Sequence, residues 1–367
     1  MQIIARRLTA LTAAVVITGA AVVTAGTQAL PAFERNMASL AAVEGITPAT
    51  VGRLRTVDGL HLPGPDAKTG FDAVLAAHKP PHYDADGIPM VVYGKEFVGE
   101  AHAGAQYNPV TIAAAALDFV RYRNDPRAAI EVSRYLDFLL RYGKAANNGS
   151  LLLPYKFDSL STNSRAPWYS AMAQAVAASA FLWGHRLTGD DRYLMAAVSL
   201  VVALEQDIRP PFLVPQRRGQ WPKEYPSWQY TVLDGALATL IGIWDLAQAL
   251  PAQHPQRARI VALKASVTAG ILGALPCFKS AAFGHFYADA GYSLGPGYHR
   301  TNIRLLSYLG GLDPAFAQFA EAFSIADRSI LARTWHAAVI TGHDFLVNRG
   351  LIARSRPPCV TASADRP

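Results

Sequence analysis

Tyrosines beside charged residues mark two segments of the sequence that are chemically suited to proton transfer. Lys223-Glu224-Tyr225-Pro226 offers a cation, a carboxylate and a phenol, and Tyr298-His299-Arg300 offers a second phenol near a guanidinium. A tyrosine acts as an acid or base once nearby cations lower its pKa from about 10. The two segments therefore predict proton transfer next to a substrate carboxylate. The structural alternative is that Tyr225 only packs on the neighbouring tryptophans, Trp221 and Trp228.

Three segments carry a family resemblance when they are taken in chain order. They are Pro167-Trp168-Tyr169-Ser170-Ala171-Met172-Ala173-Gln174, Glu224-Tyr225-Pro226 and Gly297-Tyr298-His299-Arg300-Thr301-Asn302. In this order they resemble the C-terminal catalytic domain of the D-glucuronyl C5-epimerases, which invert C5 of glucuronic acid within heparan-type chains. The resemblance covers roughly residues 90–325. It implies a uronyl C5-epimerase that acts on a polysaccharide and uses no cofactor.

Inversion at C5 requires an acid–base group on each face of the sugar ring. It also requires cations that neutralise the carboxylate while an enolate-like intermediate forms. The resemblance implies that Tyr225 and Tyr298 share the proton transfers, with Glu224 as the polar neighbour of Tyr225. It also implies Tyr287 as an auxiliary catalytic or substrate-binding residue. Animal members of the family have an arginine three residues after that tyrosine, whereas this chain has Ala290, so another cation must bind the carboxylate.

The candidate substrate-binding residues are cations, aromatic rings and hydrogen-bonding side chains. They are Arg300, Arg304, Arg165, Lys223, Trp168, Tyr169, Gln106, Tyr107 and His299. Arg300 and Arg304 lie one helical turn apart, so both are expected at one mouth. Structural roles stay open beside these: Trp168 as a core residue, Gln106 beside a helix cap, and His299 as a hydrogen-bonded support.

Local signals predict helices through most of the chain from residue 107 onward. A capping residue precedes a proline at the first helical position three times, at Asn108-Pro109, Asp125-Pro126 and Asp313-Pro314. Gly143 and Gly189 are predicted to end two helices. The helix after Gly189 is predicted to begin at 190–191 and to run towards residue 206.

These elements predict a mainly α fold of helical hairpins, either an (α/α) toroid or an incomplete (α/α) barrel. Leu233, Leu237, Leu240 and Trp244 recur at helical spacing and predict a helix with one apolar face. Another helix candidate covers 255–275, and a short mixed N-terminal segment contains one strand candidate at 88–93. In such a fold, the long loops at 145–166, 208–229 and 276–299 are expected to gather at one mouth. A functional site is expected there, because loops on a rigid scaffold commonly carry function.

The charge balance favours an acidic partner. The 367 residues include 34 lysines and arginines against 27 acidic residues, a net charge of +7. This excess suits an acidic polysaccharide, or it only keeps the protein soluble. The basic residues form no stripe of the kind that binds nucleic acid. Cys277 and Cys359 are the two cysteines. A disulfide between them stays open, and the absence of CxxC pairs argues against a structural zinc site.

The N-terminus predicts export. Arg6-Arg7 precede an uncharged apolar run at residues 8–25, which is the arrangement of a signal peptide or of an N-terminal membrane anchor. The expected organisation is this leader at 1–30, the mixed segment at 31–100, the catalytic domain at 101–345 and a flexible tail at 346–367. The catalytic body is expected in the periplasm, outside the cell, or tethered to the outer side of a membrane.

Other functions stay open beside the epimerase. One is a polysaccharide lyase or uronyl hydrolase on the same scaffold, and another is a non-catalytic glycan-binding module. A homodimer also stays open. No nucleotide cofactor is predicted, because the sequence has no GxGxxG or GxxxxGK[ST] motif, and no metal is predicted either. The calcium-like start at Asp84-Ala85-Asp86-Gly87 has Lys95 where the twelfth position requires glutamate.

Overall fold

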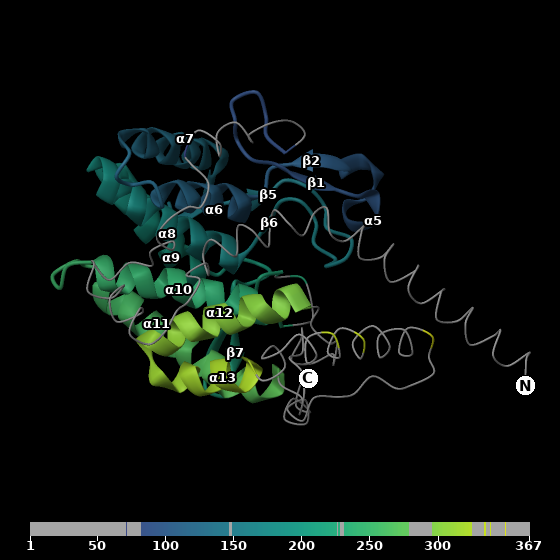
Figure 1. Ribbon diagram of the computed structural model, residues 1–367, viewed down its shortest axis with the longest axis vertical. Coiled ribbons are helices and arrows are strands. Elements are labelled where there is room, and N and C mark those ends of the chain that lie inside the picture. Colours follow the sequence, from purple (N-terminus) through teal and green to yellow (C-terminus); the bar gives the residue numbers. More distant parts are fainter. Residues whose placement is uncertain are drawn as a thin grey trace, which may run out of the picture.

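The computed structural model describes Phe71, residues 82–146, 149–225, 227, 231–278 and 296–324, and the single residues 334, 338 and 349. Within these residues the fold is mainly helical, as predicted (Figure 1). The leader at 1–30, Tyr287, Ala290 and Cys359 lie outside the described residues, so the expectations about them stay predictions.

In the described part of the chain, four helical hairpins follow one another and build two layers. They are α6 (Pro109–Val120) with α7 (Pro126–Tyr142), α8 (Ala171–Thr188) with α9 (Asp191–Val202), α10 (Leu233–Ala249) with α11 (Arg257–Ala274), and α12 (Pro296–Leu312) with α13 (Pro314–Ser324). The first helices pack in series, α6 on α8, α8 on α10 and α10 on α12, and each second helix packs on its own partner (Figure 1). Such a row of hairpins is compatible with an (α/α) toroid, and closure into a ring stays a prediction.

The helix starts predicted from cap–proline pairs are confirmed by side-chain hydrogen bonds. The Oδ1 atom of Asn108 accepts hydrogen bonds from the backbone N–H groups of Val110 (3.0 Å) and Thr111 (3.2 Å). Asp125 and Asp313 accept in the same way at the starts of α7 and α13. These caps satisfy backbone donors that the first helical turn leaves unpaired.

The predicted helix ends are also found, with one difference in length. Gly189 ends α8 with a φ of 71°, a left-handed conformation that glycine adopts without steric cost. Gly143 follows α7 in an extended conformation. The helix predicted to run towards residue 206 ends at Val202 and continues as the 3-10 turn η2 (Ala203–Glu205).

The prediction of a single apolar face on α10 was wrong. Every residue from 233 to 247 is buried, because α10 packs against α8, α11 and α12. Small residues permit this packing: a Cβ atom added at Gly242 would lie 2.1 Å from the carbonyl oxygen of Ala175 in α8. A buried hydrogen bond of 2.6 Å from Ser179 Oγ to Asp245 Oδ2 also joins α8 to α10. α10 is therefore the central helix of the described fold.

Eight short strands pair into four antiparallel ladders within the described residues. They are β1 (Val91–Tyr93) with β2 (Gly104–Gln106), β3 (Lys144–Ala145) with β4 (Leu151–Leu152), β5 (Pro154–Tyr155) with β6 (Trp168–Tyr169), and β7 (Leu213–Gln216) with β8 (Gly219–Pro222). The short helices α5 (Lys95–Val98), η1 (Glu100–His102) and η3 (Leu275–Phe278) complete the set. Figure 1 shows β1, β2, β5 and β6 gathered at one end of α6 and α8.

The described part of the N-terminal segment shares the core of the helices. Ile88 and Val98 are buried in the same hydrophobic cluster as Ala113 and Leu117 of α6. The β1–β2 ladder pairs residues 91–93 with residues 104–106. The boundary expected near residue 100 therefore does not separate two cores among the described residues.

One segment of the described residues, Arg257–Phe278, is long and apolar enough to cross a membrane. Its buried side chains recur at helical spacing, with Ile260, Leu263 and Val267 among them, and the helix packs on α10 and β8. This pattern is typical of a helix that covers the core of a folded domain. Cys277, at the end of this segment, is disulfide-bonded.

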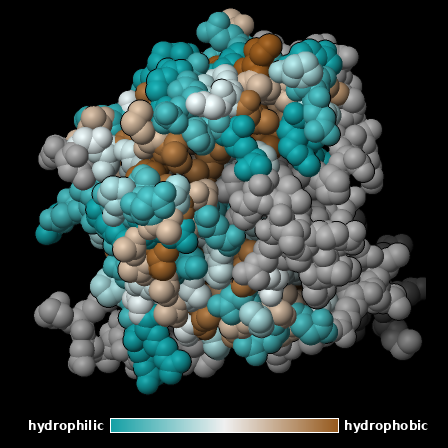
Figure 2. All heavy atoms as spheres, turned by 90° about the vertical axis from the view of Figure 1, so that its left-hand side faces the viewer, coloured by the Kyte–Doolittle hydropathy of each residue, from teal (hydrophilic) through white to brown (hydrophobic). Residues whose placement is uncertain are grey.

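The large hydrophobic side chains that are exposed come from separate elements. They are Phe97, Ile130, Leu160, Met195 and Val261. Figure 2 shows one face of the molecule, on which hydrophilic residues surround separate hydrophobic areas. Scattered apolar side chains of this kind are common on proteins and do not mark an interaction site.

Candidate active site

The Glu224-Tyr225 segment follows Lys223, whose backbone N–H and carbonyl groups both form hydrogen bonds. Lys223 follows β8 directly, and its N–H group donates to the carbonyl oxygen of Phe212 (2.7 Å). The carbonyl oxygen of Lys223 accepts from the N–H group of Ala171 (3.0 Å), the first residue of α8. The segment therefore joins the β7–β8 ladder to the start of a core helix.

Glu224 is buried at the start of α10. Its carboxylate accepts a hydrogen bond from the hydroxyl group of Tyr225, and its Oε2 atom has no partner among the described residues. A Cβ atom added at Gly235 would lie 2.3 Å from this Oε2 atom. Glycine at this position of α10 therefore makes room for the carboxylate.

Two buried carboxyl groups meet at this point. Burial raises the pKa of Glu224 well above its ordinary value, and the charge of Asp234 raises it further. Burial also raises the pKa of Asp234, from 3.8 to about 6. Since two like charges in a poorly solvated site oppose each other, Glu224 retains a proton to a higher pH than an exposed glutamate does.

The pKa of Tyr225 is raised, whereas the sequence led us to expect that cations would lower it. Burial is the largest cause, followed by the negative charge of Glu224 and by the neighbouring Tyr298. Tyr225 therefore carries its proton at neutral pH. An acid–base role for this residue requires a partner that accepts that proton, and Glu224 is in hydrogen-bond contact with it.

Tyr298 is placed beside Tyr225 from a different element. It lies in the first turn of α12 and is half-buried, and it is close enough to Tyr225 to influence that residue's pKa. The structure therefore brings together Tyr225, Glu224 and Tyr298 from two segments that are distant in the sequence. These three are the residues singled out for proton transfer.

His299 ties α12 to α13. Its Nε2 atom lies 2.9 Å from the carbonyl oxygen of Phe323, so this nitrogen donates a hydrogen bond to that acceptor. The imidazole is buried and stacks on the ring of Phe323. This arrangement favours the supporting role considered for His299 over contact with a substrate.

Asn302 was not singled out from the sequence, yet it is the least satisfied polar side chain of α12. It is 1% exposed, and neither its Nδ2 nor its Oδ1 atom has a hydrogen-bond partner within the described residues. Asn302 follows Tyr298 by four residues, so the two share one face of the helix. A buried amide left without partners is a recognised sign of a missing ligand or water.

Arg300 and Arg304 share a face of α12, but it is not the face of Tyr298. Arg300 is two residues from Tyr298, which corresponds to about 200° around the helix axis. Arg300 is exposed and Arg304 is half-buried. Neither has an ion-pair partner in the part of the chain that is described. No carboxylate of the described residues therefore competes with an acidic ligand for these two guanidinium groups.

A hydrogen-bonded aromatic cluster supports the site, and two of its members, Tyr93 and Tyr155, were not indicated by the sequence. The Asn108 amide donates to the hydroxyl oxygen of Tyr93 (2.8 Å) and accepts from the hydroxyl group of Tyr155 (3.2 Å). The negative charge of Glu224 contributes to the raised pKa of both tyrosines, after burial as the main cause. The ring of Tyr155 stacks on Trp168 at 3.8 Å, and Trp168 lies 5.8 Å from the ring of Tyr225.

The remaining predicted substrate-binding residues differ in how free their side chains are. Trp168 is buried, and its Nε1–H group donates a hydrogen bond to the carbonyl oxygen of Phe157 (2.9 Å). This arrangement favours the role of a core residue over that of a substrate-binding residue. Arg165 pairs with Asp158 at 2.6 Å. Lys223 is buried, and Tyr169 is half-buried.

Gln106 and Tyr107 also have partners within the fold. The Gln106 amide donates to the carbonyl oxygen of His102 (2.8 Å), and the Tyr107 hydroxyl group donates to Asp84 Oδ2 (2.6 Å). Among the described residues, no three histidine, cysteine, aspartate or glutamate side chains gather in a way that could hold a metal ion.

Residues 146–323 match the family model described as D-glucuronyl C5-epimerase C-terminus. The match includes the Glu224-Tyr225 segment, Tyr298 and Asn302. It therefore spans the cluster that the structure assembles.

Proposed function

Because residues 146–323 belong to the D-glucuronyl C5-epimerase family through its C-terminal domain, we propose that this protein inverts C5 of D-glucuronate residues, to L-iduronate, within an acidic polysaccharide. The observation that carries the proposal is the contact between Tyr225 and buried Glu224, with Tyr298 beside them. The incomplete (α/α) toroid is part of the same proposal, with this cluster at its mouth.

The reaction begins with removal of the C5 proton by Tyr225. The C5–H bond breaks as the Tyr225 oxygen takes the proton, and the hydroxyl proton of Tyr225 passes to the carboxylate of Glu224. The electron pair left at C5 moves into the substrate carboxylate, which becomes an enediolate. The raised proton affinity of buried Glu224 favours this relay, because a carboxyl group with a higher pKa is a better match for a weak carbon acid.

The reaction ends with proton return from the opposite face of the sugar ring. The hydroxyl group of Tyr298 donates its proton to C5, and the electron pair of the enediolate forms the new C–H bond. Tyr298 then regains a proton and Glu224 loses one through exchange with solvent. Because each face has its own tyrosine, the sugar inverts without turning over in the site.

Stabilisation of the enediolate falls to donors on α12. Asn302 supplies an unpartnered amide on the face of Tyr298, whereas Arg300 and Arg304, on the other side of α12, supply positive charge that attracts the acidic chain. Donors aimed at the position where charge develops are the largest single contribution in many enzymes. Lys223 and Arg165 contribute less in this proposal, since one is buried and the other is paired with Asp158.

The first test is exchange of the C5 proton in heavy water, followed by proton NMR of heparosan. We expect Tyr225→Phe to lower exchange by at least ~10²-fold, because it removes the hydroxyl group and keeps the ring. Tyr193→Phe is the matched control, since the Tyr193 hydroxyl donates to a carboxylate, Asp137 (3.1 Å), outside the site. Exchange at the normal rate in folded Tyr225→Phe would remove this residue from the mechanism.

The second test separates the two faces. Given each pure epimer as starting material, Tyr298→Phe should lose conversion but still exchange the proton that Tyr225 reaches. Tyr225→Phe should show the complementary preference. If both variants lose exchange from both epimers equally, the assignment of one tyrosine to each face is wrong. Unsaturated products would instead indicate a lyase, and binding without exchange or cleavage would indicate a glycan-binding module.

Export to an oxidising compartment belongs to the same proposal. The leader-like residues 1–30 and the disulfide-bonded Cys277 support it, since structural disulfides persist mainly outside the cytosol. A reporter enzyme that is active only after export, fused behind residues 1–30, should become active in cells. An inactive reporter would contradict the proposed location.

A further inference from the structure

The β5–β6 ladder has two faces with different partners. Tyr155 is paired with Trp168, and Pro154 is paired with Tyr169. Side chains alternate between the faces of a ladder, so Tyr155 and Trp168 share the face that meets Tyr225. Pro154 and Tyr169 point to the opposite face, away from the proposed reaction centre.

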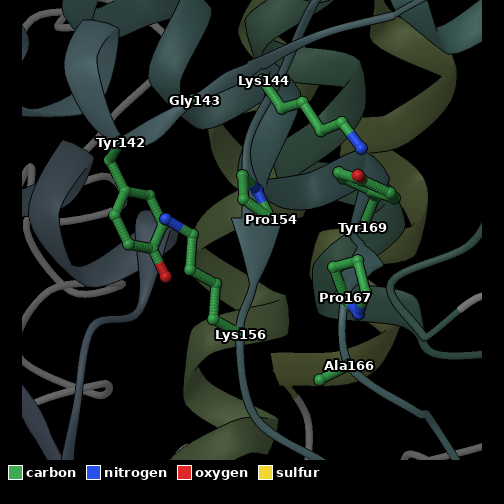
Figure 3. Close-up of a pocket in the computed structure, with 8 residues that line it drawn as sticks. All are labelled: Tyr142, Gly143, Lys144, Pro154, Lys156, Ala166, Pro167 and Tyr169. Carbon is green, nitrogen blue, oxygen red and sulfur yellow. The ribbon is translucent and has the colours of Figure 1, made fainter.

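A pocket of about 470 Å³ lies on this opposite face (Figure 3). Its lining residues come from the end of α7, from β3, from the outer positions of β5 and β6, and from the residues next to these elements. They are Tyr142, Gly143, Lys144, Pro154, Lys156, Ala166, Pro167 and Tyr169. The volume falls within the roughly 300–1,000 Å³ that is usual for small-ligand sites.

The pocket carries two positive charges that no carboxylate among the described residues balances. Lys144 and Lys156 are exposed, and neither has a carboxylate partner in the described chain. The lining contains no aspartate or glutamate. The ammonium group of Lys156 lies 3.9 Å from the centre of the Tyr142 ring, and Figure 3 shows the Lys144 and Lys156 side chains ending on either side of Pro154.

The other lining groups suit a sugar. Tyr142, Tyr169 and the two prolines present ring surfaces, and aromatic side chains can pack on apolar surface through the ring while the hydroxyl group forms hydrogen bonds. Cations beside such rings bind a carboxylate or sulfate group, which a neutral sugar lacks. The pocket therefore combines the two features that an acidic sugar requires.

We propose that this pocket, the outer pocket, binds an anionic sugar residue of the same polysaccharide at a distance from the sugar that reacts. The identity of the polymer rests on the proposed function, whereas the choice of an anionic sugar rests on the pocket itself. Two linked contacts on one chain raise its effective concentration at the site. A long polymer therefore gains affinity from the outer pocket, and an oligosaccharide too short to reach both positions does not.

The test compares two double variants with the same change of charge. Lys144→Gln/Lys156→Gln removes the cations of the outer pocket. Lys95→Gln/Lys264→Gln is the control, because Lys264 also lies over an aromatic ring, Trp244, at 4.4 Å. Both double variants lower the net charge of +7 by two. Equal thermal unfolding midpoints would show that both are folded.

The measurements are the affinity for long heparosan, chondroitin and alginate chains, and C5 exchange in a saturating heparosan tetrasaccharide. We expect the outer-pocket variant to bind its preferred long polymer about tenfold more weakly than the control variant, since exposed ionic contacts are individually weak. Exchange in the tetrasaccharide should be unchanged. Neutral dextran should not bind to wild type.

Equal affinity of the two double variants would overturn the outer pocket, and so would binding of dextran as strong as that of the acidic polymers. Absence of binding to all three acidic polymers would overturn it as well. The proposed function fails separately, when wild type binds an acidic polymer but introduces no deuterium at C5. In that case a lower affinity of Lys144→Gln/Lys156→Gln still supports the outer pocket.

Discussion

At the scale of single residues, the buried amide of Asn302 has the most direct consequence. An unsatisfied buried polar group costs about 1–3 kcal/mol, so Asn302→Leu should raise the free energy of unfolding by about that amount. It should also lower C5 exchange, since the amide is proposed to contact the substrate. Denaturant unfolding and NMR exchange measure the two effects on the same sample.

The control for Asn302 is Thr268 in α11. Its Oγ1 atom is also buried without a partner among the described residues, and it lies outside the proposed site. Thr268→Val should stabilise the protein without a change in exchange. If Asn302→Leu behaves like this control, the amide has no part in the reaction.

The carboxyl pair predicts how stability depends on pH. The folded pKa of Asp234, about 6, exceeds its ordinary 3.8, so the folded state binds the proton more tightly than the unfolded state. Asp234 therefore makes its full favourable contribution to the free energy of unfolding below about pH 4, and this contribution is lost as the pH rises through about 6. Relative to Asp234→Asn, the wild-type free energy of unfolding should fall over this window, by at most about 3 kcal/mol.

Denaturant unfolding between pH 4 and 7 measures this difference. Asp190 should show the opposite dependence of stability on pH. Arg192 lowers the pKa of Asp190, so the contribution of Asp190 to the free energy of unfolding is lost as the pH falls. Asp234→Asn should also lower the pKa of Glu224, since it removes a neighbouring negative charge. The acid side of the exchange profile should therefore move to lower pH. An unchanged pH profile of C5 exchange would show that Glu224 takes no part in the proton relay.

At the scale of elements, the start of α10 positions the carboxylate. An alanine Cβ at position 235 would meet Glu224 Oε2 at 2.3 Å and Glu224 Cβ at 2.8 Å. Gly235→Ala must therefore displace the Glu224 side chain, and C5 exchange should drop by at least tenfold. Gly273→Ala in α11 is the control, because the nearest atom to its Cβ would be 3.7 Å away.

Both alanines gain up to about 1 kcal/mol of helix propensity, so stability alone does not predict the difference in exchange. Circular dichroism should show that both variants keep their helices. Full exchange in Gly235→Ala would mean that the position of Glu224 is not critical.

Helices were predictable from the sequence because their signals are local. Asn108, Asp125 and Asp313 each cap a helix through atoms within a few residues of themselves. The all-round burial of α10 was missed, because it depends on which helices surround it rather than on its own spacing.

The site was predictable only where a short motif carried it. Glu224, Tyr225 and Tyr298 stand in recognisable segments. Tyr93 and Tyr155 reach Asn108 through pairings that bring distant segments together, and strands of two or three residues are too short for alternation to be visible. Asp234 resembled an ordinary residue in the first turn of a helix, and only the folded chain places it beside Glu224.

At the scale of the whole molecule, excess positive charge should govern polymer binding. Affinity for an acidic polysaccharide should fall as salt rises, because exposed ionic contacts are screened. Arg300→Gln/Arg304→Gln should reduce this salt dependence, since neither guanidinium has a carboxylate partner in the described chain. Arg165→Gln should change it less, because Arg165 is already paired with Asp158. An affinity that stays constant across a salt titration would contradict a polyanionic substrate.

The two-sided β5–β6 ladder also bears on how such a protein can change over evolutionary time. Alternate positions of the same two strands support the tyrosine cluster and line the outer pocket. A substitution at an outward position can alter the preferred polymer while the inward neighbour keeps its packing. Selectivity and chemistry are thus free to diverge separately, although adjacent residues in the sequence encode them.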